Sequence, residues 1–456
     1  MSSRTVSRRK RAVRRQEAPE FSFTREDVES ISRSLGESET LKTQRLSAWQ
    51  KYVSLPMPTT KDEAWRRTDI RGLEFDRVKL QASETTPVSP DLHQPLDVSS
   101  PGTMLVLRPG HAPEREAEDG LDAEGVVFTD WATATRDHVE ILEQYVGTVV
   151  PTEDGKFAAL AAAMSQEGVL LYVPAGVQIQ QPLHSIFWAP GTGTAFFHRV
   201  LVILERGASA TFFHETASPT QEDSQTLHAG IVEISVAEEA SLKFVEVQNL
   251  GGHVWNFTHE RAKVGREGRM DWIFGAVGSQ LTKTFSDLDL TEQGAEGRIS
   301  GFYFASDRQH FDHDTQQNHL APDTTSDLLY KGALIDRSRS VWQGMIYVAP
   351  DAQRTDGFQA NRNLIISKKA RADSIPGLEI LADDVRCTHG ATVSQLEALP
   401  IFYLMTRGFP REEAERMVID GFFSSIMERI PFDGVQERFR GMIEAKLGNY
   451  RRTAIQ

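Results

Sequence analysis

The sequence contains a single cysteine, Cys387, among 456 residues. One thiol cannot form a disulfide within the chain, which is typical of proteins from reducing compartments and predicts a cytoplasmic location. One thiol also cannot complete a cysteine-only zinc or iron–sulfur site, because such sites need about four thiolates. A thiolate-rich metal site would therefore need ligands from another chain.

Several patterns typical of membrane, nucleic-acid-binding and catalytic proteins are also absent. No apolar run approaches the ~20 residues that a transmembrane helix needs, so no membrane span is expected. The net charge of −14 makes nucleic acid a poor candidate partner, because phosphates repel an acidic surface. The sequence has no P-loop, no Gly-x-Gly-x-x-Gly, no Gly-x-Ser-x-Gly and no His-Glu-x-x-His. These absences lower the expectation that the chain is an enzyme.

The N-terminal third divides into two predicted parts. Residues 1–23 carry seven Lys or Arg residues before the first acid, Glu17, and we expect a disordered basic tail, with a targeting signal as the alternative. Residues 24–167 are expected to be helical or mixed, with Thr24 as the N-cap of the first helix. Asp27 occupies the capping-box position, but its side chain is shorter than that of the usual Glu, so we expect no complete box.

Residues 168–385 have the pattern of a β-protein, since short apolar runs alternate with Gly, Pro and charged turns. A strand, a polar turn, a small residue and a new strand recur, and Ala208, Ala240 and Gly268 are 32 and 28 residues apart. Strand-only repeats of this length predict a β-solenoid, with an irregular β-sandwich as the alternative. Residues 386–456 are again expected to be helical and to cover an open end of the solenoid.

One candidate metal site is a histidine-rich segment that contains His310, Asp312, His313 and His319. Imidazoles and carboxylates suit zinc or ferrous iron. On a strand, however, His310 and Asp312 would face one side and His313 and His319 the other, so a bulge or turn would be needed to gather three ligands. Polar side chains lining a coil or a subunit interface are the favoured alternative.

The second candidate is the pair Cys387 and His389, which would project from one face of an extended segment. A thiolate and an imidazole are ligands for iron, zinc or the edge of a cluster, but two ligands hold a metal only weakly. The site would have to be completed across an interface or to act transiently. A nucleophile–base pair and a buried structural cysteine are the alternatives.

The segment around Cys387 resembles the signature of the SufB/SufD family of iron–sulfur cluster assembly proteins. The matching residues are Leu378-Glu379-Ile380, Ala382-Asp383-Asp384-Val385, Cys387, His389-Gly390-Ala391-Thr392, Phe402-Tyr403-Leu404-Met405 and Arg407-Gly408. Further matches are His310, Asp312-His313, Thr315, Tyr330-Lys331-Gly332, Gln343-Gly344, Gln359, Asn361 and Asn363-Leu364. The glycine after His389 and the motif Lys61-Asp62-Glu63-x-Trp65-x-x-Thr68-Asp69 resemble the SufD branch.

The resemblance implies a right-handed parallel β-helix flanked by N-terminal and C-terminal helical regions. It implies a non-catalytic scaffold that pairs with a SufB-like subunit and binds a SufC-like ATPase through the region 394–448, which would explain the missing P-loop. It places His389 and Cys387 at the interface with the SufB-like subunit, where iron or a nascent iron–sulfur cluster would be held transiently and no cofactor stably. A SufB-like member, a metal-dependent enzyme that uses the histidine-rich segment, and a homodimer of the isolated chain are the alternatives.

Overall fold

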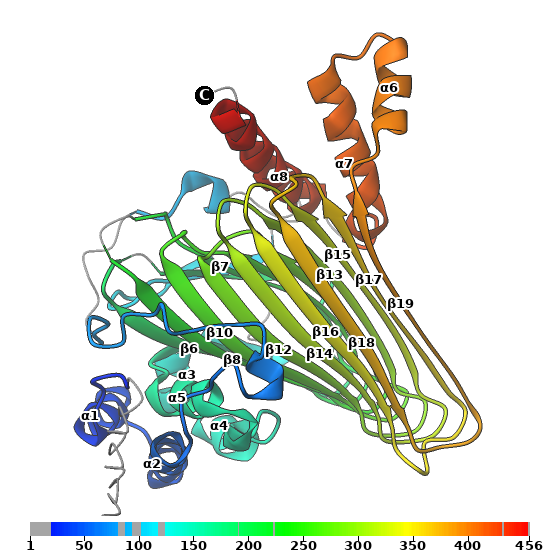
Figure 1. Ribbon diagram of the computed structural model, residues 1–456. Helices are drawn as coiled ribbons and strands as arrows, with labels where there is room; N and C mark the ends of the chain where they lie inside the picture. The colour runs from blue at the N-terminus through cyan, green and yellow to red at the C-terminus, as the bar shows by residue number, and fades with distance from the viewer. Residues whose placement is uncertain are drawn as a thin grey trace, which may run out of the picture.

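The computed structural model describes residues 20–80, 87–93, 102–116, 124–189, 191–221, 224–430 and 433–454. Its centre is a solenoid of parallel strands that lies between two groups of helices (Figure 1). Sixteen strands, β4 to β19, alternate between two sheets, so two strands make one turn and the solenoid has about eight turns. The predicted β-solenoid with helical regions at both ends is therefore confirmed.

Each sheet collects alternate strands of the chain. The ten-stranded sheet has the order β19-β17-β15-β13-β11-β9-β7-β5-β1-β2, with bounds β1 Thr103–Leu107, β2 Glu114–Glu116, β5 Leu183–Trp188, β7 Ser209–Ala217, β9 Ser241–Asn249, β11 Arg269–Ala276, β13 Glu296–Ala305, β15 Thr325–Leu334, β17 Thr355–Ile365 and β19 Val385–Gln395. The nine-stranded sheet has the order β18-β16-β14-β12-β10-β8-β6-β4-β3, with bounds β3 Val127–Asp130, β4 Glu167–Val173, β6 Ala195–Leu204, β8 Thr226–Val236, β10 Val254–Val264, β12 Leu281–Leu290, β14 His310–His319, β16 Arg339–Val348 and β18 Arg371–Ile380.

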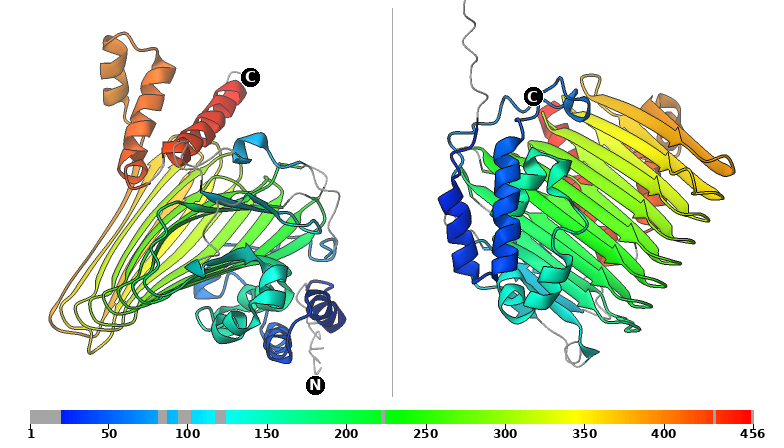
Figure 2. Two further views of the ribbon diagram at one scale, coloured as in Figure 1. Left: turned by 180° about the vertical axis from the view of Figure 1, so that it is seen from behind. Right: turned by 90° about the horizontal axis from the view of Figure 1, so that it is seen from below.

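Apart from α6, the helices lie on the outer faces of the two sheets and do not cover the last turn formed by β18 and β19, so the expectation that residues 386–456 cover an open end of the solenoid was wrong. Their bounds are α1 Arg25–Leu35, α2 Glu39–Ser54, α3 Trp131–Asp137, α4 Val139–Tyr145, α5 Lys156–Met164, α6 Ala398–Thr406, α7 Arg411–Met427 and α8 Asp433–Ala454. The N-terminal helices lie over the nine-stranded sheet and α7 and α8 lie against the other sheet (Figure 2). Regular β-structure continues to the end of β19, so the C-terminal helices begin at α6 rather than at residue 386. No helix in the described ranges is long and apolar enough to cross a membrane.

The polar turn of the sequence repeat is the corner of each solenoid turn. Gly207, Glu239 and Glu267 occupy these corners with φ of 68°, 58° and 53°. The backbone N–H of Gly207 donates to the carbonyl of Glu238, and that of Glu239 donates to the carbonyl of Arg266, each at 2.9 Å. The corners of successive turns are therefore hydrogen-bonded to one another. Each corner needs one residue in the left-handed conformation, so a short polar turn that can adopt it recurs in the sequence.

The interior of the solenoid is filled by side chains from both sheets, and in β13 and β15 aromatic rings lie beside glycines. Tyr303 is the register partner of Gly332, and Tyr330 is the partner of Gly301. A Cβ atom on Gly332 would lie 2.0 Å from the ring of Tyr303, and one on Gly301 would lie 2.4 Å from the ring of Tyr330. Both tyrosines are fully buried, so a side chain at either glycine position would overlap the neighbouring ring in the close-packed interior.

The first helix begins at Thr24 as predicted, but its capping box is complete. The N–H of Thr24 donates to Asp27 Oδ2 at 2.7 Å, and the N–H of Asp27 donates to Thr24 Oγ1 at 3.2 Å. The prediction that aspartate is too short was wrong, because the extended backbone of Thr24 brings its N–H within reach of the shorter carboxylate. Phe21 and Phe23 are buried with ring centroids 5.2 Å apart, so packing begins within the predicted tail, whose residues 1–19 lie outside the described ranges.

Candidate functional site

The last turn of the solenoid, formed by β18 and β19, ends both sheets. β18 pairs with β16 and β19 pairs with β17, and within the described residues neither has a strand on its other side. This edge lies far from the N-terminal helices (Figure 1). It also exposes the apolar side chains of Leu378, Ile380, Leu381 and Val393. Unpaired backbone groups beside exposed apolar side chains form a surface to which another strand could be added.

Cys387 and His389 lie on this last turn, on the inner face of β19. Cys387 is the register partner of Gly357, and His389 is the partner of Gln359. Gln359 is fully buried in the interior, and parallel partners share a face, so both candidate residues are directed toward the end of the interior. His389 is exposed because no further turn covers it, whereas Cys387 is half-buried.

The thiol of Cys387 lies in an apolar environment. It packs against the cluster of Ile346, Val348, Ala352 and Ala382. Burial raises the pKa of the Cys387 thiol above its ordinary value, so the neutral thiol predominates at neutral pH. A protonated thiol is a weak nucleophile, and this environment therefore does not favour the nucleophile–base interpretation.

The structure brings Cys387 close to His319, which the sequence assigned to a different candidate site. A Cβ atom on Gly357 would lie 3.2 Å from Cys387 Sγ and 3.4 Å from His319 Nε2, so both side chains border the space that this glycine leaves open. The imidazole of His319 is hydrogen-bonded through Nδ1 to Thr324 Oγ1 at 2.7 Å and through Nε2 to Ser326 Oγ at 2.8 Å. Burial lowers the pKa of His319 to about 4, so the ring is neutral at neutral pH.

His310 and Asp312 lie on the outer face of β14, where they hold the N-terminal region. The hydroxyl of Thr68 donates to Asp312 Oδ2 and lies 2.8 Å from His310 Nε2. Asp312 Oδ1 also accepts a hydrogen bond from Lys283 Nζ at 2.9 Å, and both side chains of this ion pair are fully buried. Burial lowers the pKa of His310, so the neutral ring donates its Nε2–H to the threonine hydroxyl. Thr68 belongs to the N-terminal motif, which therefore acts here as an anchor.

His313 lies on the opposite, inner face of β14 in an aromatic environment. Its ring centroid is 5.1 Å from that of Phe274 and 5.3 Å from that of Tyr303, and neither ring nitrogen has a hydrogen-bond partner within the described segments. Burial lowers the pKa of His313 to about 3. The predicted separation of the histidines onto two faces is therefore confirmed. In the part of the chain that the structure describes, no three His, Cys, Asp or Glu side chains converge on a possible metal position.

Sequence reasoning missed a group of buried polar residues inside the solenoid. Burial raises the pKa of Glu246 and Glu260 above the ordinary value near 4.5, and the charge of Glu246 raises that of Glu260 further. Ser286 Oγ donates to Glu260 Oε2 at 2.8 Å, and the raised pKa values favour a protonated carboxyl group in this buried pair. One signal was present, because Glu246 is in phase with the apolar residues Leu242 and Phe244 on β9.

A second exposed apolar surface lies on α6 and the loop after it. We call it the α6 surface: Leu399, Phe402, Tyr403, Met405 and Phe409. Leu399 is 76% exposed and Phe402 is 63% exposed. Figure 1 shows that α6 and the adjoining half of α7 project away from the solenoid. Large apolar side chains clustered on a projecting helix are typical of a protein-binding surface.

Comparison with known families accounts for most of the chain. Residues 187–422 match the model of the SufBD core domain of the SUF system for FeS cluster assembly, and residues 23–184 match the model of the SufBD protein N-terminal region. The first match begins within β5 and ends within α7. It therefore includes the last turn of the solenoid with both candidate residues.

Full-length relatives show the same affiliation. The chain is 29% identical to the iron–sulfur cluster assembly protein SufB of Bacillus subtilis over 439 residues, which cover 92% of each protein. It is also 29% identical to the iron–sulfur cluster assembly protein SufD of the same organism over 433 residues, which cover 94% of this chain and 98% of the relative. The identity to a SufBD family protein of Staphylococcus saprophyticus is likewise 29%, over 436 residues that cover 92% of each protein. Equal identity to SufB and SufD does not separate the two branches. The chain belongs to the SufB/SufD family of iron–sulfur cluster assembly proteins.

Proposed function

We propose that this chain is a SufD-like scaffold subunit of a SUF complex, which pairs with a SufB-like subunit and contributes to nascent cluster formation at their interface. The observation that carries the proposal is the uncovered edge of β18 and β19 in the same turn that bears His389 and Cys387. The glycine at 390 and the N-terminal motif that includes Thr68 support the SufD-like assignment. A SufB-like role is the alternative, since the chain is equally similar to both named relatives.

Pairing through the last turn would pair the free backbone groups of this edge and also bury its exposed apolar side chains. A second solenoid that aligned its own terminal strands with β18 or β19 would use their unpaired backbone groups and cover the exposed apolar side chains. His389 would then lie at the junction, with the thiol of Cys387 below it. Two ligands from this chain are too few for stable coordination, so iron or a nascent cluster would be cargo completed by the partner and released. The same edge would allow a homodimer when the chain is alone.

The test of the site is His389→Ala in a complex co-expressed with its SufB-like and SufC-like partners. Because His389 is exposed, we expect normal folding and assembly but loss of cluster formation, measured as iron and acid-labile sulfide per complex. The matched control is Thr388→Ala, an exposed neighbour that points to the other face of β19. A wild-type cluster yield from His389→Ala would overturn the site assignment.

We further propose that the α6 surface, within the region 394–448, docks the SufC-like ATPase. In this arrangement the present chain is non-catalytic and its partner hydrolyses ATP. Phe402→Asp should abolish copurification of the ATPase, because a charge would be placed in the centre of an apolar contact. Val53→Asp, which charges an exposed apolar site on α2, is the control and should retain the ATPase. Retention by Phe402→Asp would refute the docking assignment.

A further inference from the structure

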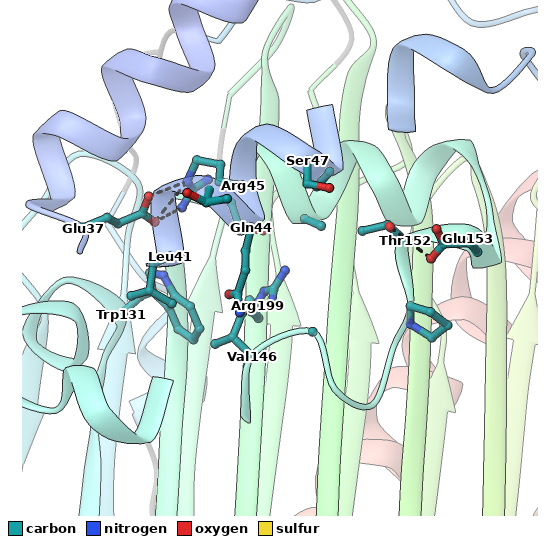
Figure 3. Close-up of a pocket in the computed structure, with 16 residues that line it drawn as sticks. Glu37, Leu41, Gln44, Arg45, Ser47, Trp131, Val146, Thr152, Glu153 and Arg199 are labelled. Carbon is teal, nitrogen blue, oxygen red and sulfur yellow. Dashed lines mark hydrogen bonds and ion pairs between the residues drawn. The ribbon is translucent and has the colours of Figure 1, made fainter. Parts of the chain in front are cut away.

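A pocket of about 410 Å³ lies at the N-terminal region, remote from the last turn of the solenoid. It is bordered by α2, by the segment that follows α4 and by the outer face of the nine-stranded sheet (Figure 3). Leu41, Trp131, Val146 and Pro151 supply apolar walls, and Trp131 adds a flat indole ring. This volume falls within the range of ~300–1,000 Å³ in which small-molecule sites are found.

Arg199 on β6 is one of several charged groups that line the pocket, and among the described residues only one of its N–H donors has a hydrogen-bond partner. Its side chain is only 5% exposed, and its Nη1 donates to Glu233 Oε2 at 3.0 Å. Among the described residues, no other hydrogen bond is made by this guanidinium. Glu233 is occupied by further donors, since it accepts the backbone N–H groups of Val149 and Val150 at 3.2 and 3.1 Å. The nitrogen atoms of Arg199 are not among the fully buried polar atoms that lack a partner, so its remaining N–H groups reach the space of the pocket and are available to water or to an acceptor group of a ligand.

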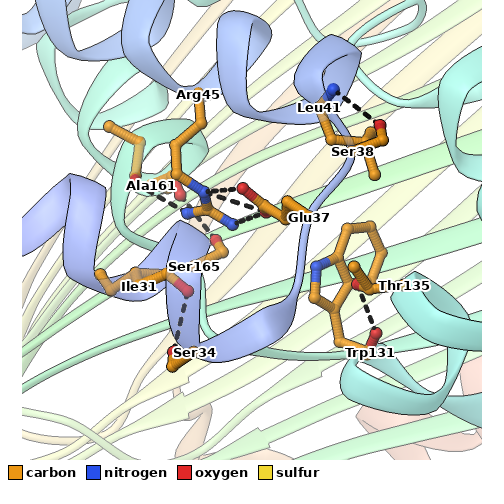
Figure 4. A network of polar contacts seen from close by, with 11 residues as sticks. Ile31, Ser34, Glu37, Ser38, Leu41, Arg45, Trp131, Thr135, Ala161 and Ser165 are labelled. Atoms are coloured by element: carbon orange, nitrogen blue, oxygen red, sulfur yellow. Dashed lines mark hydrogen bonds and ion pairs between the residues drawn. The ribbon is translucent and has the colours of Figure 1, made fainter.

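A second arginine in the pocket wall is fully engaged and shapes the site. Arg45 on α2 binds both carboxylate oxygens of Glu37 (Figure 4). Its Nη1 also donates to the carbonyl of Ala163 at 2.8 Å. At the rim, Glu153 is paired with Lys51 at 3.0 Å. These pairs neutralise the charges of the wall without using Arg199. Arg199 is therefore a charged donor of the pocket that is only partly engaged, and its Cζ lies 5.8 Å from the centroid of the Trp131 ring.

We propose that this pocket binds a small carboxylate with a flat apolar body. The carboxylate accepts two N–H groups of Arg199 in the side-by-side geometry that a guanidinium fork offers. The apolar body lies against Trp131 and Leu41, where it displaces water from the apolar walls. The partial neutralisation of Arg199 by Glu233 keeps the binding modest. The proposal is independent of the cluster-assembly role, because it uses no residue of the last turn or of the α6 surface.

Phenylacetate is a suitable probe, because it joins a carboxylate to a single aromatic ring. We expect saturable binding to the purified full chain with a Kd of about 1 mM or below, measured by ligand-observed NMR and calorimetry. Phenethylamine, which carries a cationic head on the same ring, should not compete. Equal binding of phenethylamine, or no saturable binding of phenylacetate, would overturn the proposal.

Two variants on α2 locate the binding. Ser47 is exposed and lines the pocket, so Ser47→Phe should fill the pocket without disturbing the core and weaken phenylacetate binding at least about tenfold. Lys42→Phe adds the same ring on the same helix outside the lining and should leave binding unchanged. Arg199→Lys keeps the charge but removes the fork, and it should also weaken binding about tenfold in a protein of native circular dichroism. Unchanged binding in Ser47→Phe would contradict the assignment.

Discussion

Lys283→Met removes one partner of a fully buried ion pair and should destabilise the protein strongly. Lys283 Nζ lies 2.9 Å from Asp312 Oδ1 and 3.7 Å from Asp314 Oδ2, and it lies over the ring of Phe285. Methionine has a similar length and fills the same space, so the substitution removes the charge and leaves the packing nearly intact. After it, the hydroxyl of Thr68 is the one donor to Asp312 that remains among the described residues.

The expected loss of unfolding free energy is about 3–5 kcal/mol, because one buried charge is left without its counter-charge. That is a large fraction of the ~5–15 kcal/mol that stabilises a typical folded protein. The double variant Lys283→Met/Asp312→Asn removes both charges, and we expect it to recover more than half of the loss. The control is Arg354→Met, which breaks the exposed pair with Asp323 and should change stability by no more than about 1 kcal/mol.

Equilibrium urea denaturation followed by tryptophan fluorescence gives the comparison, with the slope of the transition checked for each variant. Hydrogen exchange adds a local readout, since the segment from Trp65 to Phe75 should open more readily when Asp312 no longer anchors Thr68 correctly. If Lys283→Met lies within 1 kcal/mol of the wild type, or if the double variant is the less stable of the two, the reasoning from burial is refuted.

Three further changes test other parts of the solenoid and its first helix. Glu246→Gln should stabilise the protein at pH values above the ordinary carboxyl pKa near 4.5, because there the unfolded chain loses a proton that the buried pair with Glu260 retains. The free energy of unfolding, measured against pH, should therefore fall less steeply for this variant than for the wild type. Gly332→Ala should destabilise by about 1–3 kcal/mol or prevent folding, since its Cβ would overlap the ring of Tyr303, and thermal melts should show no comparable loss for Gly441→Ala, where a Cβ meets open space. Thr24→Ala should lower stability by about 1 kcal/mol, and a denaturation midpoint equal to that of the wild type would show that the capping box contributes nothing.

The repeat and the strand alternation made the central architecture predictable. The corners around Gly207 and Glu239 recur because each turn needs the same short left-handed connection, and this requirement is local. The period of two along β14 correctly separated His310 from His313, because side-chain direction in a strand depends only on position. The same alternation assigned Cys387 and His389 to one face.

Other features depended on which turn lies beside which. Cys387 lies close to His319 because β19 pairs with β17, and Gly357 of β17 faces His319 of β14 across the interior. The turns differ in length, so a single sequence does not show which residues of the two sheets face each other. The raised pKa values of Glu246 and Glu260 and the burial of the Arg199 side chain have the same origin, since each depends on desolvation by segments that are distant in the sequence.

The sequence by itself therefore determined the solenoid, the helices at both ends and the family, because these follow from local periodicity and from a contiguous signature. Only the tertiary structure decided which residues lost contact with water. It turned His310 and Asp312 into an anchor for Thr68, enclosed His313 among aromatic rings, and left His389 exposed at an unpaired edge. Burial and strand pairing are collective properties of the folded chain, and they separate a structural histidine from one that is available to a partner.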